Sequence, residues 1–146
     1  MRNRPAAEPR VRPERACTLA SLLATLESWL VEGAPSAFVA AYAIAPENAG
    51  ARGTGGESIP RVRRRLQREA HPGEAVAIGA GDAVVLAFRA SDENAVGRRV
   101  ARLRASLERE GLPPDDLVIA GAAPSDGARS LLERALAEAR VSACAR

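Results

Sequence analysis

An aspartate stands in a turn between two apolar runs near the centre of the sequence. The stretch from Glu74 to Phe88 reads EAVAIGAGDAVVLAF, and Asp82 is the only charged residue of its turn. Glycines such as Gly79 and Gly81 are frequent in tight turns because they adopt backbone conformations that other residues avoid. The pattern therefore predicts either a catalytic turn built around a carboxylate or an ordinary hairpin bend.

The other candidate groups are a run of arginines and a single histidine. Five arginines lie between Arg61 and Arg68, on a predicted helix whose apolar residues form one stripe. Such a run either clamps phosphate or forms a solvated helix face. His71 is the only histidine, and the two cysteines, Cys17 and Cys144, lie far apart in the sequence. This inventory excludes a metal cluster of histidine and cysteine, and also a disulfide framework.

The basic excess of the chain is confined to its beginning. The formal net charge is +3, and residues 1–15 alone account for it, because the rest of the chain has as many acidic residues as arginines. A nucleic-acid-binding domain is basic in its folded part and often offers aromatic stacking platforms. Aromatic residues make up only 3% of this chain. We therefore expect no nucleic-acid partner.

Length and composition predict one domain over residues 16–146, since 47% apolar residues suffice for a core. Residues 1–15 contain proline and arginine without apolar periodicity, which predicts a disordered tail or a tether for an acidic partner. The longest apolar run, residues 37–45, is about half the length that spans a bilayer. The N-terminus has no signal-peptide core. These features predict a cytoplasmic protein without membrane insertion.

The apolar periodicity predicts an α+β chain. A leading helix precedes a βαββαβ order, the ferredoxin-like arrangement of an antiparallel sheet with helices on one face, and a C-terminal helix follows. Pro60 is expected in the first turn of the second helix and Ser91 at the cap of the third. The helices are expected over residues 18–30, 59–70, 91–110 and from 125, and the strands over 36–45, 115–123 and the hairpin 74–88.

This order, with a glycine-aspartate hairpin between the second and third strands, resembles the GGDEF family of diguanylate cyclases over residues 17–141. The signature turn falls on residues 80–84, and ENAVGRRVARLRASL, VIAGAA and LLERALAEA resemble the helix, strand and helix that follow. The resemblance implies a palm-like fold. It also implies a homodimer that condenses two GTP molecules to cyclic di-GMP, with a divalent metal held by acidic residues from the first strand and the turn.

The metal-binding residues of that family are only partly present. Asp82 occupies the metal-binding position of the turn, but the neighbouring glutamate is Ala83. The two first-strand aspartates correspond to Ala40 and Tyr42, and the phosphate-binding lysine to Ala45. One carboxylate holds Mg²⁺ poorly, so we expect no catalytic residue and no cofactor, with Mg²⁺ present only if GTP binds. The alternative is an active cyclase with an unusual metal site.

The resemblance also implies a guanine-nucleotide site. The family reads the base with an asparagine and, nine residues later, an aspartate, and this chain has Asn48 and Glu57 at that spacing. With Gly79, Gly81 and Asp82 they form the predicted nucleotide-binding set. The alternative is an asparagine turn followed by a glutamate at a helix start.

Many members of the family bind cyclic di-GMP at an inhibitory Arg-x-x-Asp before the signature strand. The equivalent here runs from His71 to Glu74, with Arg68 one helical turn earlier. A histidine donates to phosphate but is only partly charged near neutral pH. The alternative is a surface histidine that closes a helix C-terminus.

Two functions are therefore predicted. The first is a catalytically inactive GGDEF-like signalling domain that binds cyclic di-GMP or GTP and acts through a partner protein. The second is a ligand-free interaction or dimerisation module, for which an alanine-rich outer face over residues 131–140 could supply the docking surface.

Overall fold

The computed structural model describes residues 18–44 and 54–145, apart from the side chains of residues 54–57. The predicted N-terminal tail lies outside the described residues. Within the described part of the chain, no helix is both long and apolar enough to cross a membrane. The elements are α1 (Leu19–Glu32), β1 (Ser36–Ala43), α3 (Thr54–Glu69), β2 (Ala75–Gly79), β3 (Ala83–Ala90), α4 (Glu93–Arg109), the short 3₁₀ turn η4 (Pro114–Asp116), β4 (Leu117–Gly121) and α5 (Ala128–Cys144).

The four strands form one sheet in the order β2-β3-β1-β4, and each neighbouring pair is antiparallel. This order confirms the predicted ferredoxin-like arrangement. The strand β1 lies inside the sheet between β3 and β4. Its run of small and apolar residues is buried on both faces, which explains why it shows no alternation of apolar and polar residues.

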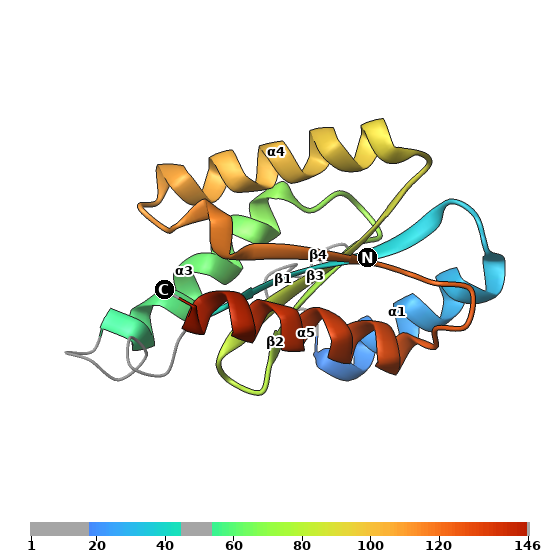
Figure 1. Cartoon of the computed structure of the whole chain (residues 1–146), viewed down its shortest axis with the longest axis horizontal. Helices are drawn as coiled ribbons and strands as arrows, with labels where there is room; N and C mark the ends of the chain where they lie inside the picture. Colours follow the sequence, from blue (N-terminus) through green and yellow to red (C-terminus); the bar gives the residue numbers. More distant parts are fainter. Residues whose placement is uncertain (1–17, 45–53, 146) are drawn as a thin grey trace, which may run out of the picture.

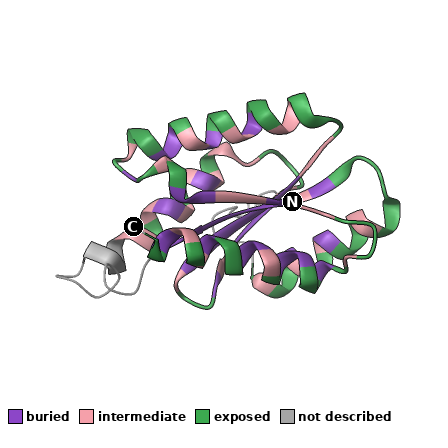
Figure 2. Cartoon of the chain, in the orientation of Figure 1, coloured by how far each residue is buried: buried purple, intermediate pink, exposed green. Residues whose placement is uncertain are grey.

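Helices cover both faces of the sheet (Figure 1), and the strands between them are the most buried part of the molecule (Figure 2). On one face α3 and α4 contribute Val62, Leu66, Leu103 and Leu107 to a core cluster. On the other face, side chains of α1 and α5 form a second cluster with β1. The two helices of the βαββαβ core thus share one face, as predicted, while the leading and C-terminal helices cover the opposite face.

Three predicted helix starts are wrong by a few residues, and one of them is that of α5, which begins at Ala128 and not at residue 125. The helix α3 begins at Thr54, so Pro60 lies inside the helix and not in its first turn. Proline is common in first turns, but this preference does not fix a boundary. The cap of α4 is Asp92, whose side chain accepts a hydrogen bond from the Ala95 backbone N–H at 2.8 Å. Ser91 was the predicted cap. Both residue types are good caps, so the sequence did not separate them.

The predicted alanine-rich outer face of α5 is wrong. The alanines at 128, 135, 139 and 143 are buried against the sheet, where small side chains allow the helix backbone to approach the strands closely. Among the exposed residues of this helix, Val141 is the large apolar one, with 70% of its surface exposed. The alanine pattern of α5 therefore reports packing inside the domain.

Candidate functional site

The β2–β3 hairpin turn consists of Ala80, Gly81 and Asp82. Ala80 and Gly81 both have positive φ, at 57° and 83°. The first of these is unusual for a residue with a side chain. Gly79 is the last residue of β2, and a Cβ there would lie 3.3 Å from a methyl carbon of Leu136. Gly81 is thus explained by the bend, whereas Gly79 is explained by the close approach of α5.

Asp82 is held by an arginine that sequence reasoning missed. Arg140 of α5 donates from Nε to Asp82 Oδ2 and from Nη2 to Asp82 Oδ1, each at 2.9 Å. This two-pronged hydrogen bond raises the pKa of the Arg140 guanidinium. Both carboxylate oxygens therefore face a cation supplied by the chain itself. The two residues are 58 positions apart, and no local pattern connects them.

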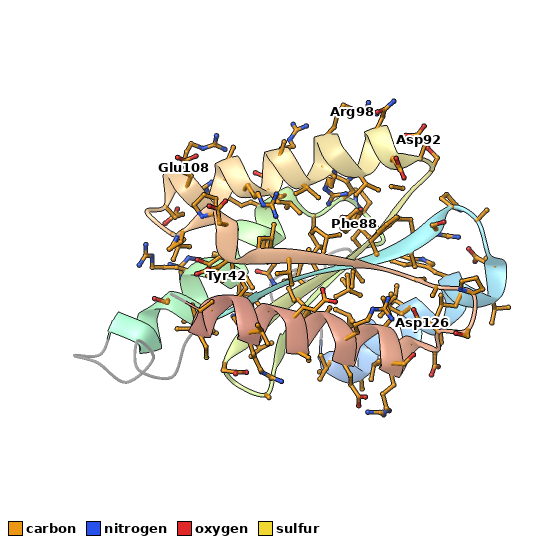
Figure 3. All side chains as sticks on the ribbon, in the orientation of Figure 1. Tyr42, Phe88, Asp92, Arg98, Glu108 and Asp126 are labelled. Carbon is orange, nitrogen blue, oxygen red and sulfur yellow. The ribbon has the colours of Figure 1, made fainter. Side chains whose placement is uncertain are left out.

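The residues around the turn do not fit a divalent cation. Ala40 and Tyr42, at the family's first-strand positions, are buried in the apolar cluster beneath α3 and α4. The Tyr42 hydroxyl donates to the Pro113 carbonyl at 3.0 Å, and Figure 3 shows Tyr42 beside α3. Among the described residues, no group of three His, Cys, Asp or Glu side chains could hold a metal ion. Asp82 is left as one carboxylate that already has a cationic partner.

The other predicted nucleotide-binding residues are only partly covered by the structure. Asn48 lies outside the described residues, and so does the side chain of Glu57, whose backbone belongs to the first turn of α3. Their joint role in reading guanine stays a prediction.

The second predicted site lies in the loop that joins α3 to β2. Glu74 Oε1 accepts a hydrogen bond from the His71 backbone N–H at 2.9 Å, and Gly73 between them has a φ of 88°. The structure thus brings His71 and Glu74 together. Arg68 is exposed in the last turn of α3 and lines neither of the two clefts beside this loop.

A buried ion pair fixes this loop to α4. Arg99 Nη1 donates to Glu74 Oε2 at 2.8 Å, and Arg99 Nη2 contacts Glu74 Oε1 as well. Arg99 Nη2 also donates to the Glu69 carbonyl at 3.1 Å. The guanidinium carbon lies 5.1 Å from the centroid of the Phe88 ring, a distance typical of a cation–π contact. Both charged side chains are only 9% exposed, so the pair is held out of water.

Beside this pair lies a cleft of about 290 Å³, which we call the basic cleft. Four of its residues are arginines, and Arg98 and Arg102 are exposed on α4. Figure 3 shows Arg98 on the outer side of α4 and Phe88 between α4 and the sheet. The basic cleft is lined by His71, Arg89, Ala90, Ala95, Arg98, Arg99 and Arg102.

A second cleft of about 360 Å³, which we call the tryptophan cleft, shares two residues with the basic cleft, His71 and Arg89. Its remaining wall comes from Trp29 of α1 and from the loop before β2. The lining residues are Trp29, His71, Pro72, Gly73, Glu74 and Arg89. Sequence reasoning singled out His71 and Glu74 here, but it missed the arginines of α4, Arg89 and Trp29.

No family model matches the chain, and no curated protein matches it either. Solved structures do match. The S helix-GGDEF-EAL part of LapD from Vibrio cholerae, bound to c-di-GMP, superposes with a TM-score of 0.63 at 16% identity. The superposition covers 85% of this chain and 32% of the LapD chain, so the present chain spans about a third of that solved chain. The chain has a GGDEF-like fold.

Two further structures share the GGDEF-like fold over most of their length. The GGDEF domain of DgcB from Caulobacter crescentus, in complex with c-di-GMP, has a TM-score of 0.60 at 15% identity, with coverage of 88% of this chain and 84% of that one. A diguanylate cyclase/phosphodiesterase from Caldicellulosiruptor saccharolyticus has a TM-score of 0.58 at 15% identity and coverage of 81% and 76%. At these identities the likeness establishes the fold, and the role of each site residue has to be argued from this chain.

Proposed function

We propose that this chain is a catalytically inactive GGDEF-like signalling domain that binds cyclic di-GMP in the basic cleft. The main observation in support is that His71, Arg98, Arg99 and Arg102 line one cleft. This cleft adjoins the loop that resembles the family's inhibitory site. Two structures of the same fold, LapD and DgcB, were solved with c-di-GMP. Their ligand supports the choice of probe for this chain.

The chemistry of the cleft suits a ligand with two phosphodiester groups. Guanidinium groups bind phosphate oxygens through two parallel hydrogen bonds, and such charge-assisted bonds are about twice as strong as neutral ones. Arg98 and Arg102 are exposed and line the cleft, so they suit this task. Arg99 donates from both Nη atoms to Glu74 and from Nη2 to the Glu69 carbonyl, so it ties the loop that carries His71 to α4. In this proposal Glu74 and Arg99 are positioning residues, and Arg98 and Arg102 contact the ligand.

The direct test is isothermal titration calorimetry with cyclic di-GMP. Micromolar or tighter binding is expected for the unmodified chain. Arg98→Ala and Arg102→Ala are each expected to weaken binding roughly tenfold, because each removes a hydrogen bond to a charged group. Both side chains are exposed, so the domain is expected to remain folded.

Arg109→Ala is the matched control for this titration, because Arg109 is an exposed arginine of the same helix outside the cleft. It is expected to bind cyclic di-GMP like the unmodified chain. Absence of binding by the unmodified chain, or equal losses in all three variants, contradicts a specific site at this cleft. Binding of GTP with Mg²⁺ in place of cyclic di-GMP points instead to the predicted set around Asn48, Glu57 and Asp82.

The proposed lack of catalysis rests on Asp82. Its two oxygens pair with Arg140, and Ala40 and Tyr42 supply no second carboxylate. We expect no cyclic di-GMP from GTP with Mg²⁺ or Mn²⁺. Arg140→Met is expected to free Asp82 and still give no product, because one carboxylate remains too few for the metal. Chromatography of the incubation mixtures measures the cyclic di-GMP formed. Cyclic di-GMP made by either the unmodified chain or Arg140→Met contradicts the proposal.

A partner protein is proposed to receive the signal. Arg64, Arg68 and Arg109 are exposed on α3 and α4, and exposed arginines favour an acidic partner. The second candidate, a dimerisation module without ligand, is tested by sedimentation. A stable dimer whose mass is unchanged by cyclic di-GMP, together with no heat of binding in calorimetry, would favour the dimerisation module.

A further inference from the structure

Arg89 is a half-buried arginine that lines both clefts and is held by several contacts. Its Nε donates to the Pro35 carbonyl at 3.0 Å, and its Nη1 donates to Glu32 Oε1 at 2.6 Å. Its guanidinium carbon lies 5.4 Å from the centroid of the Trp29 ring. The side chain is 19% exposed. The guanidinium is therefore fixed from the side of α1 and β1 before any ligand arrives.

Arg89 also stands between the two clefts. Together with His71 it lines the basic cleft and the tryptophan cleft. The basic cleft has the guanidinium groups that suit phosphate. In the tryptophan cleft the Arg89 guanidinium lies over the Trp29 ring, and a guanidinium plane backed by an aromatic ring stacks on the face of a nucleobase. A cyclic dinucleotide carries a base next to each phosphate, so adjacent clefts of these two kinds match its two chemistries.

We propose that Trp29 and Arg89 form a base-stacking wall, against which a purine of the bound cyclic dinucleotide lies while its phosphates contact the basic cleft. This inference rests on the proposed function, since it requires the nucleotide to bind at these clefts. It assigns a binding role to the end of α1, which the sequence motifs do not cover. Stacking tolerates either purine, so the wall contributes to affinity without choosing between guanine and adenine.

The test combines calorimetry with fluorescence of Trp29, which is the only tryptophan of the chain. Cyclic di-GMP is expected to change the Trp29 emission, with a midpoint that agrees with the calorimetric Kd. Trp29→Leu keeps an apolar side chain but removes the aromatic face, and it is expected to weaken binding roughly tenfold. Arg89→Lys keeps the charge but removes the planar group, and a similar loss is expected. Trp29→Phe restores a ring and is expected to recover much of the affinity.

The outcomes separate this inference from the proposed function. If the unmodified chain binds cyclic di-GMP, but its emission does not change and Trp29→Leu binds equally well, the stacking wall is overturned while the proposed function stands. If the unmodified chain does not bind at all, both are overturned. If Trp29→Leu and Trp29→Phe lose affinity equally while their thermal unfolding midpoints match, an aromatic face is not what the site requires, and the wall is again overturned.

Discussion

Replacing Arg99 by methionine is expected to lower the free energy of unfolding by about 3–5 kcal/mol and to weaken binding of cyclic di-GMP, because the loop that carries His71 loses its contact with α4. The stability loss follows because Glu74 keeps its charge but loses its partner in a place where its side chain is only 9% exposed. The cation–π contact with Phe88 is lost as well. Urea unfolding measures the first effect, and calorimetry measures the second.

A double variant separates folding from binding. In Arg99→Met with Glu74→Gln neither charge remains, so no buried charge is left unpaired. The glutamine still offers an oxygen to the His71 backbone N–H. Most of the lost stability is therefore expected to return, whereas binding is not. Arg109→Met, on the exposed end of the same helix, controls for the loss of any arginine. A double variant that binds cyclic di-GMP like the unmodified chain would contradict the role given to Arg99.

An aspartate at position 40 is expected to destabilise the domain by about 3 kcal/mol or more, although it restores a residue type that the GGDEF resemblance expects there. Ala40 is fully buried, and its neighbours on the adjacent strands are Leu86 and Ile119. A carboxylate in such a place has no water and no cation to stabilise it. Thermal and urea unfolding of Ala40→Asp measure the effect, and no cyclase activity is expected from this variant.

The cost of this substitution is expected to depend on pH. Burial raises the pKa of an aspartate at position 40 in the folded state, so its penalty is present above the unfolded pKa, near 3.9. The part of the penalty that comes from the charge disappears as the pH falls below that value, and the cost of burying a neutral polar group remains. Ala40→Asn, of the same shape but without a charge, is the matched control. The two variants are expected to differ at neutral pH and to converge in acid. Equal stability of the two at neutral pH would show that water or a cation reaches this position.

The pairing of Asp82 with Arg140 shows why the signature turn was only partly predictable. The sequence indicated a hairpin with a carboxylate in its turn, and the structure has that hairpin. Whether the carboxylate faces a metal or a guanidinium depends on where α5 crosses the sheet. That crossing depends on buried side chains of α5 such as Leu136, which lies against Gly79 and is far from the turn in the sequence.

The loop before β2 was also only partly predictable from the sequence. His71 and Glu74 were singled out from a four-residue pattern, and the hydrogen bond between them is local. Arg99, which decides the electrostatics of that loop, is 25 residues from Glu74. The sequence suggested Arg68 for this place instead, because Arg68 lies about one helical turn before His71. The pattern could not tell which arginine lies under the loop, because that depends on how α4 packs over β3.

The sequence by itself determined the order of the elements, the hairpin and the antiparallel α+β class, because apolar periodicity and turn residues act over a few neighbours in the chain. Only the tertiary structure decided where the charges meet. Residues 16–146 have no net charge by count, yet sheet order and helix packing gather arginines from β3 and α4 around one cleft. They also place an arginine of α5 on Asp82. The residues of these ion pairs and clefts are far apart in the sequence. Which of them meet therefore depends on how the helices and the sheet pack in the core.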